Sequence, residues 1–455
     1  MIKSNKIMKL YLSVLFGVFC ISASAIIPPD STNVAQKTKI EFFLQKGKQD
    51  LYSKNYRAAL EDFRGVLRID KDHPLAHYRV AECQIKLRAY TFAIKHLKQA
   101  YEKDAEVSKE YFYTLGTAQH RVGKLDEAID SYKKFDATLT SDTKKEEYNI
   151  TMLIAQVEFA KKMIANPTKA KTENFTDLNT RYREYGATMA PDGKTIYFTA
   201  RRNDTYGGGI NEGDQAYYSD IYQSVWDEEN DEWTEAENLE GKINTEMFDE
   251  INDLRINEDG TMEIYVTVNV KGWTKSSDLG VSKLSKKGTW GQAKLLPKKT
   301  INTSYFESSC SFTEDGQTMF FVSNKPVKGK GFQKADIYMS KKEGNKWSEP
   351  VNLGDNINTK FDEIACSVTP DGKYLFFSSR GHDNMGGYDI FMSKFENGEW
   401  SKAKNLGYPI NSVDDDLTFK LYDNNKKALM TSVREDGKGQ YDIYKVDLSE
   451  LNIFE

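Results

Sequence analysis

Apolar residues follow two different periods along the chain, and the change between them predicts two domains. Over residues 40–140 the apolar positions recur every three or four residues, which predicts amphipathic helices. Beyond residue 173 they alternate in short runs such as TIYFTA and YLFFSS, which predicts half-buried β-strands. The segment 165–173 carries Asn166-Pro167 and several lysines and fits neither period. We therefore expect a multidomain α and β chain in which the helices come first.

Small residues recur at a fixed interval in the helical part. Ala59, Ala93 and Ala128 are 34 and 35 residues apart, and a small residue stands twelve positions before each of them. Large residues flank these alanines at constant offsets, namely Tyr56, Tyr90 and Leu125 before them and Phe63, Leu97 and Tyr132 after them. This is the spacing of tetratricopeptide (TPR) repeats, in which neighbouring helices pack closely. We predict a TPR solenoid over residues 39–165, with three repeats and a capping helix at 146–164.

The β-rich part is also a repeat, with a unit of 53 to 58 residues. Each unit has a tight-turn sequence between two alternating runs, and Asp-Gly supplies the positive φ that such turns need. A strand that begins with aspartate follows, and in four units a tryptophan comes 11 to 13 residues later. The turns are Pro191-Asp192-Gly193, Glu258-Asp259-Gly260, Glu314-Asp315-Gly316, Pro370-Asp371-Gly372 and the degenerate Asp423-Asn424-Asn425. We predict a β-propeller over 172–449 with five blades, six being the alternative, and we expect residues 172–180 to close it.

The first 25 residues have the three parts of a secretory signal peptide. Three lysines precede an apolar stretch at 10–21, and an Ala-Ser-Ala sequence supplies the small residues of a cleavage site. Residues 26–38 are expected to form a linker, and no later stretch is long and apolar enough to predict a transmembrane segment. Cys20 follows a bulky phenylalanine, which leaves lipid anchoring open. The signal peptide predicts export, and the net charge of −5 argues against nucleic acid as a partner.

The two repeats together carry a family resemblance. YTLGTAQHRVGKLDEAIDSYKKF at 113–135 and TPDGKYLFFSSR at 369–380 resemble the TPR plus WD40-like (PD40/TolB-type) β-propeller proteins of Gram-negative cell envelopes. The architecture is similar to that of PorE-like periplasmic proteins of type IX secretion and gliding, with no OmpA-like segment found after the propeller. The resemblance implies a non-enzymatic scaffold or accessory subunit in the periplasm, peripheral to the outer membrane. Its partners would be proteins of an envelope complex, and peptidoglycan binding is not expected without an OmpA-like domain.

Acidic residues recur just before each predicted innermost strand, near one mouth of the propeller channel. The acids selected are Asp249, Glu307, Asp362 and Asp414. Paired carboxylates could make a five-bladed glycoside hydrolase, and clustered oxygens could hold a divalent cation. Their regular recurrence favours structural pairing, because an acid and a base need different environments. We therefore predict no catalytic residue, no metal and no cofactor; the alternatives are the glycoside hydrolase and a sensor of small ligands or cell-wall fragments.

The first helix of each TPR pair is expected to line a partner-binding groove. Counted from the packing positions, the groove residues are Tyr52, Tyr78, Glu82, Lys86, Tyr113, Thr117, His120 and Arg121. Aromatic side chains with interspersed charge suit an extended peptide or a partner helix. The alternative is that these tyrosines pack between helices.

Overall fold

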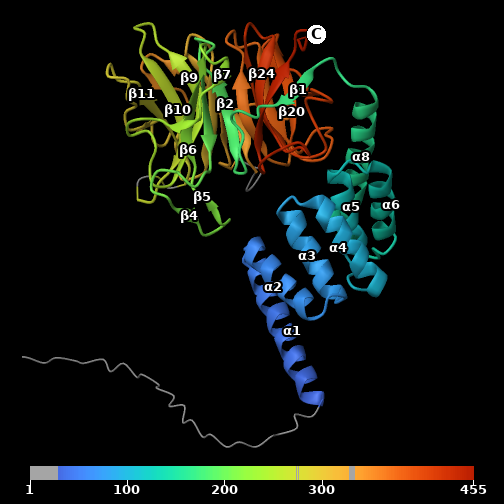
Figure 1. Ribbon diagram of the computed structural model, residues 1–455. Helices are drawn as coiled ribbons and strands as arrows, with labels where there is room; N and C mark the ends of the chain where they lie inside the picture. The colour runs from blue at the N-terminus through green and yellow to red at the C-terminus, as the bar shows by residue number, and fades with distance from the viewer. Residues whose placement is uncertain (1–28, 273, 275, 327–333, 455) are drawn as a thin grey trace, which may run out of the picture.

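The computed structural model describes residues 29–272, 274, 276–326 and 334–454. The predicted signal peptide at 1–25 lies outside these residues. The described chain forms a helical-repeat domain followed by a five-bladed β-propeller, as the two apolar periods predict (Figure 1). No helix in the described ranges is both long and apolar enough to cross a membrane.

The helical domain consists of antiparallel helix pairs in chain order. Its helices are α1 (Pro29–Tyr52), α2 (Tyr56–Ile69), α3 (Pro74–Lys86), α4 (Tyr90–Lys103), α5 (Tyr111–Arg121), α6 (Leu125–Asp136), α7 (Asp142–Tyr148) and α8 (Ile150–Ala165). α1 begins inside the segment 26–38 that was predicted to be a linker. The single capping helix predicted at 146–164 is two helices, because Asn149 adopts a left-handed conformation with φ of 46° between α7 and α8.

Small residues bring the paired helices together at the predicted positions. A Cβ atom added at Gly47 or at Gly116 would lie 2.8 Å from the ring of Phe63 or Tyr132, respectively. The repeat alanines on α2, α4 and α6 are fully buried, so the predicted TPR spacing is confirmed. Ile150 of α8 is buried against α6 in the same apolar cluster, which covers the open face of the last repeat.

Five antiparallel sheets form the blades of the propeller. The innermost strands are β2 (Glu184–Met189), β9 (Phe248–Ile256), β13 (Glu307–Phe312), β18 (Glu363–Val368) and β23 (Asp416–Tyr422). The second strands are β3 (Thr195–Ala200), β10 (Met262–Asn269), β14 (Thr318–Ser323), β19 (Tyr374–Ser379) and β24 (Lys427–Ser432). The third strands are β6 (Asp220–Asp227), β11 (Asp278–Lys283), β15 (Asp336–Glu343), β20 (Asp389–Glu396) and β25 (Asp442–Asp447).

Short segments complete the outer edges of the blades. They are β7 (Glu232–Trp233), β8 (Glu237–Asn238), β12 (Lys294–Leu295), β16 (Lys346–Trp347), β17 (Val351–Asn352), β21 (Glu399–Trp400) and β22 (Lys404–Asn405). A separate small hairpin, β4 (Ile210–Asn211) with β5 (Ala216–Tyr217), extends from the first blade toward the helices (Figure 1).

The ring closes by a strand from the N-terminal side, as predicted. β1 (Lys171–Asn174) is antiparallel to β25, with Lys171 opposite Asp447 and Asn174 opposite Tyr444. The strand therefore covers the first part of the predicted 172–180 segment. It supplies the outer strand of the fifth blade, so the chain forms five blades and the six-bladed alternative is wrong.

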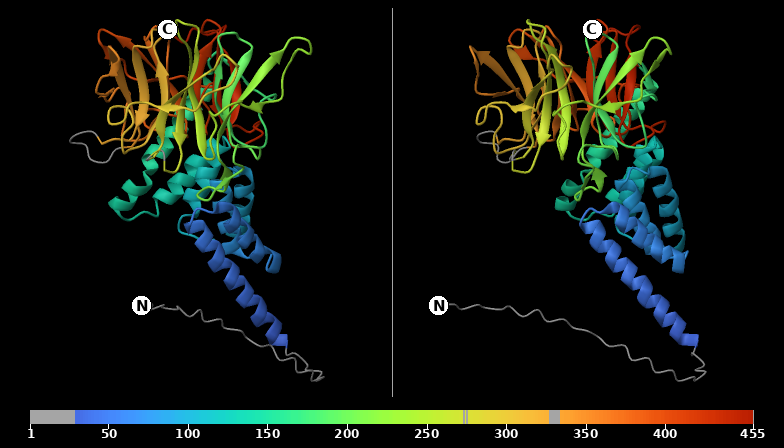
Figure 2. Two further views of the ribbon diagram at one scale, coloured as in Figure 1. Left: turned by 90° about the vertical axis from the view of Figure 1, so that its left-hand side faces the viewer. Right: turned by 60° about the vertical axis from the view of Figure 1, so that its left-hand side comes forward.

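The helical domain lies against one side of the propeller, below it in Figure 2. Its contacts reach the loops that precede the innermost strand β23 and the third strands β20 and β25. The hairpins between first and second strands lie at the opposite side. The two mouths of the channel therefore differ, because only one of them faces the helices.

Candidate functional site

Each innermost strand has a buried carboxylate at its first or second residue, and this carboxylate holds the turn before the strand. We call these the anchor carboxylates; they are Glu184, Asp249, Glu307, Glu363 and Asp416. Each accepts a hydrogen bond from the backbone N–H of the threonine or serine four residues earlier. Glu307, for example, accepts from Thr303 N at 2.8 Å, from Thr303 Oγ1 at 2.6 Å and from Ser323 Oγ at 2.9 Å. These hydrogen bonds hold each turn against the first residues of the strand that follows it.

Two of the four acids selected from the sequence are not anchor carboxylates. Asp249 and Glu307 hold that position, but Asp362 and Asp414 do not, since their neighbours Glu363 and Asp416 take it. The Asp362 carboxylate accepts a hydrogen bond from the N–H of Ala335 at 2.9 Å, and Asp414 faces the helical domain. Successive side chains of a strand point to opposite faces, so a shift of one or two residues changes what each acid meets.

Burial, and in places a neighbouring carboxylate, raises the pKa of several anchor carboxylates and of aspartates beside them. Burial raises the pKa of Asp249 to about 7, although hydrogen bonds from Thr245 oppose the shift. Burial likewise raises the pKa of Asp220 to about 7, and the charge of nearby Asp249 adds to it. Glu363 and Asp336 repeat this arrangement two blades further on. Burial raises the pKa of Glu363 to about 7, and the charge of nearby Asp336 adds to the shift. The junctions of blades 1 and 2 and of blades 3 and 4 thus share this arrangement, whereas Glu184 and Asp416 pair with Arg202 and Arg434.

Arg88 joins the helical domain to the propeller. It follows α3, and its guanidinium donates to Asp414 Oδ1 at 2.6 Å, to Asp415 Oδ2 and to the Tyr441 hydroxyl at 2.9 Å. Burial opposes its charge, but Asp414 and Asp415 raise the pKa of Arg88 above its ordinary value. Burial also opposes the charge on Asp415, yet Arg88 and Arg380 hold its pKa below its usual range. We call these contacts, together with those of His120 and Arg121 below, the domain joint.

His120 and Arg121 belong to the domain joint, which corrects their prediction as groove residues. His120 Nε2 lies 2.8 Å from the carbonyl oxygen of Met385. Arg121 donates to the carbonyl oxygens of Val413 at 2.5 Å and Gly386 at 3.2 Å. Burial, with the charge of Arg121, lowers the pKa of His120 to about 3, so the ring is neutral and can donate this hydrogen bond. Periodicity placed both residues on the right helix but could not show that the propeller covers them.

The other predicted groove residues divide into packed and exposed groups. Tyr78 is 2% exposed and its hydroxyl lies 3.0 Å from Thr114 Oγ1, so it packs between helices. Tyr113 packs against the rings of Tyr132, Phe135 and Tyr148, and Thr117 Oγ1 donates to the carbonyl of Tyr113. Glu82 is half-buried and pairs with Arg79 at 2.7 Å. Exposed positions are Lys86 and Tyr52.

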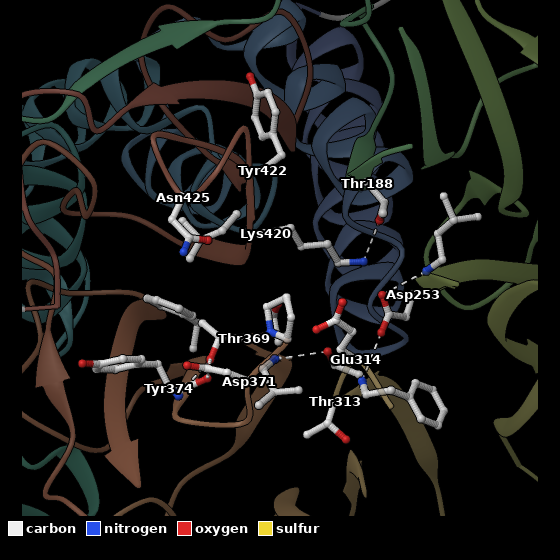
Figure 3. Close-up of a pocket in the computed structure, with 18 of the residues that line it drawn as sticks. Thr188, Asp253, Thr313, Glu314, Thr369, Asp371, Tyr374, Lys420, Tyr422 and Asn425 are labelled. Atoms are coloured by element: carbon white, nitrogen blue, oxygen red, sulfur yellow. Dashed lines mark hydrogen bonds between the residues drawn. The ribbon is translucent and has the colours of Figure 1, made fainter. Parts of the chain in front are cut away.

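A cavity of about 1020 Å³ opens at the hairpin mouth, opposite the domain joint (Figure 3). All five blades line it. Its aromatic lining residues are Phe312, Tyr374, Phe376, Tyr422 and Phe454. Pockets for small ligands occupy about 300–1,000 Å³ and combine apolar walls with a few polar groups. This cavity therefore has about the size of a ligand site, and half of its lining residues are polar or charged.

The deepest polar groups of this cavity come from equivalent positions of the five blades. We call them the channel ring: Thr188, Asp253, Ser311, Ser367 and Lys420, each four residues after an anchor carboxylate. Three are hydroxyls, one is an acid and one is a base, so the ring lacks the symmetry of the repeat. Sequence reasoning missed it, although the fixed offset of four residues from each repeated acid carries the signal.

Lys420 and Asp253 carry opposite charges across the channel. Lys420 Nζ donates to Thr188 Oγ1 at 2.7 Å and to the carbonyl of Asn252. The Asp253 carboxylate accepts from the N–H groups of Leu254 at 2.9 Å and Phe312 at 3.1 Å. Burial lowers the pKa of Lys420 and raises that of Asp253, while each charge partly offsets the shift of the other. Figure 3 shows Lys420 directed toward Thr188 and Asp253.

Metal-binding geometry is not found in the described ranges, where no group of three His, Cys, Asp or Glu side chains could hold an ion. The three described cysteines, Cys83, Cys310 and Cys366, are buried and unpaired. Burial raises the pKa of the Cys366 thiol to about 12, which keeps it protonated. The arrangement can bind and orient a molecule through ion pairs, hydrogen bonds and aromatic contact.

Comparison with known proteins gives partial matches. No family model matches the chain, and no curated protein matches it. The second TPR domain of human RPAP3, solved with an HSP70 peptide, is 18% identical with a TM-score of 0.24 and covers 27% of this chain and 98% of that chain. The TPR2B domain of yeast Sti1, in a complex with Hsp70, is 18% identical with a TM-score of 0.24. This match covers 27% of this chain and 97% of the Sti1 domain. A luciferin-regenerating enzyme is 12% identical with a TM-score of 0.33. This match covers 61% of this chain and 95% of the enzyme chain. None of these similarities carries a function to this chain.

Proposed function

We propose that this protein is a non-enzymatic scaffold that holds protein partners at the cell envelope. The observation that carries the proposal is a pair of exposed aromatic side chains on α1. Phe42 is 60% exposed and Tyr52 is 91% exposed, and both lie on a helix whose first half extends beyond the rest of the domain (Figures 1 and 2). Aromatic side chains are enriched in protein interfaces, where they bury a large area with few rotatable bonds.

The domain joint supports the same proposal. Ion pairs from Arg88 and backbone contacts from His120 and Arg121 fix the helical repeats against one mouth of the propeller. The joint leaves α1 and the hairpin side of the propeller open. Two binding surfaces joined in one molecule raise the effective concentration of one partner near the other.

We place the scaffold in the periplasm, peripheral to the outer membrane, on the evidence of the predicted signal peptide at 1–25. The resemblance to PorE-like proteins extends the proposal to a type IX secretion or gliding complex. Cell fractionation tests the location, because a periplasmic protein is released with the outer-membrane or osmotic-shock fraction after cleavage of the leader.

Affinity isolation from detergent-solubilised envelopes tests the partner surface. The tagged full-length protein is compared with a Phe42→Ala/Tyr52→Ala variant and with a matched Gln45→Ala/Lys48→Ala variant of the same helix, in which both original residues are exposed. We expect a reproducible set of companions with the wild type and the matched variant, and its loss with the aromatic variant. Recovery of the protein alone, or of the same companions with all three proteins, would contradict the proposal.

A further inference from the structure

The channel ring differs from the rest of the propeller in carrying unlike groups at equivalent positions. Three blades fill the position with the hydroxyls of Thr188, Ser311 and Ser367, and one of these accepts a hydrogen bond from the next blade, since Val368 N donates to Ser311 Oγ at 3.1 Å. Hydroxyls are therefore sufficient for blade stacking. The other two blades place a base and an acid, Lys420 and Asp253, at a position where burial penalises both charges. Asp253 accepts from Phe312 N of the next blade as Ser311 accepts from Val368 N, and Lys420 bonds to two other blades, so both groups join blades. A hydroxyl makes the same bond to the next blade at Ser311, so the charges themselves are not required for stacking.

Both charged groups have unused hydrogen-bonding capacity toward the cavity. An ammonium has three N–H donors, and the described contacts of Lys420 Nζ engage two acceptors, Thr188 Oγ1 and the Asn252 carbonyl. A carboxylate offers about four acceptor sites, and Asp253 accepts from the N–H groups of Leu254 and Phe312. The attraction between Lys420 and Asp253 acts across the channel. A ligand that lies on the hairpin side of both groups could bond to each.

The charges around the cavity favour a ligand of both signs. The cavity is lined by two cations, Lys420 and Arg255, and by three acids, Asp253, Glu314 and Asp371. A ligand with negative charge alone would meet the cations favourably but would be repelled by the acids, of which Asp253, Glu314 and Asp371 are labelled in Figure 3. A ligand with positive charge alone would be repelled by Lys420. An ammonium next to Asp253 and a carboxylate next to Lys420 satisfy both groups. The aromatic rings of Tyr374, on the far side of the cavity from Asp253 in Figure 3, and of Tyr422, above Lys420 in that view, would then contact an apolar side chain.

We propose that the hairpin-side cavity binds a small zwitterion, namely an amino acid or short peptide with a free amino and a free carboxyl end. The carboxylate pairs with Lys420, the ammonium pairs with Asp253, and the aromatic rings hold the side chain. The helical domain contacts the other mouth, so the ligand enters from the hairpin side. This activity is separate from the α1 surface, and either one can fail without the other.

Calorimetric titration of the full-length wild type with the dipeptide alanyl-phenylalanine tests the proposal without any substitution. N-acetyl and C-amide forms of the dipeptide each remove one charge. A charged hydrogen bond contributes about 1.5–3 kcal/mol, which is about a 10- to 100-fold change in affinity, so each capped form should bind at least about tenfold more weakly. If the acetylated form binds as well as the free dipeptide, the site takes the carboxyl end of a longer chain and the zwitterion proposal is wrong. The absence of binding by all forms also overturns it.

Two variants assign the charges to their residues. Lys420→Met should remove the preference for the free carboxyl end, and Asp253→Asn should remove the preference for the free amino end. Matched substitutions outside the cavity are Lys427→Met in the same blade as Lys420 and Asp259→Asn in the same blade as Asp253; both should bind like the wild type. If Lys420→Met and Asp253→Asn bind all three dipeptide forms as the wild type does, the channel ring is not the site. Circular dichroism establishes that each variant is folded before it is titrated.

Discussion

Replacement of Arg88 by methionine should weaken the contact between the two domains. The change leaves Asp414 and Asp415 without their nearest cation. Both residues are buried, with exposed fractions of 5% and 1%, so water cannot replace the lost partner. Loss of one partner of a buried ion pair costs about 3–5 kcal/mol, because the remaining charge stays desolvated. Arg380 still lies 3.3 Å from Asp415, and the Arg88 side chain is 21% exposed. We therefore expect a loss of about 2–4 kcal/mol in the free energy that couples the domains.

Urea denaturation followed by two probes measures this coupling. Loss of helical ellipticity reports the TPR domain, and tryptophan fluorescence reports the propeller, where Trp233, Trp290, Trp347 and Trp400 all lie. In the wild type the two transitions should overlap, whereas in Arg88→Met they should separate, with the helical domain unfolding first. The propeller core should keep its own transition, because the substitution removes no apolar contact within a blade.

A double-mutant cycle decides whether the buried charges are the cause. When Asp414→Asn and Asp415→Asn remove the negative charges, the added Arg88→Met change should cost less than about 1 kcal/mol. The matched control is Arg64→Met, which removes an exposed ion pair with Glu61 and should cost about 0–1 kcal/mol. If Arg88→Met costs no more than this control, or costs the same with and without the two aspartates, the explanation of the joint by buried ion pairs is wrong.

Three further predictions concern the repeats themselves. The free energy of unfolding should rise by roughly 2 kcal/mol for each of Asp220 and Asp249 as pH falls from about 8 to about 5.5, since both have a pKa of about 7 in the folded state and a lower one when unfolded. Stability from such raised pKa values is complete at low pH and is lost as pH rises through about 7; thermal melting that is flat over this range would contradict it. Gly116→Val should destabilise the helical domain by about 1–3 kcal/mol because its Cβ would lie 2.8 Å from Tyr132, which denaturation followed by ellipticity measures. A propeller that begins at residue 175 should melt below one that begins at 171, because it lacks β1, and equal melting temperatures would show that β1 is not needed.

The repeats were predictable because residue type and spacing decide them directly. Only a small residue fits at Gly47 and Gly116, where a neighbouring ring approaches within 2.8 Å of an added Cβ, so the period is visible in the sequence. The anchor carboxylates were predictable only to within one or two positions. Asp362 and Glu363 are neighbours, and strand register, which depends on pairing with another strand, decides which of them contacts the turn.

The domain joint could not be predicted from the same patterns. His120 and Arg121 lie on the expected helix, but the surface that covers them belongs to loops about 265 and 292 residues further along the chain. Such docking depends on the complementarity of two folded surfaces, and periodicity carries no information about it. The channel ring could have been predicted from the sequence. Lys420 follows an anchor carboxylate at the same offset as Thr188, and the change from threonine to lysine is visible in the sequence.

The pairing of β1 with β25 has a consequence for synthesis and export. β1 emerges before any blade, while its partner β25 ends at Asp447, near the last described residue. The seam of the ring can therefore form only after the chain has been made as far as β25, and until then β1 is an unpaired edge strand beside the completed helices. A chain that stopped a few residues before β25 would keep four whole blades and still be an open, association-prone ring.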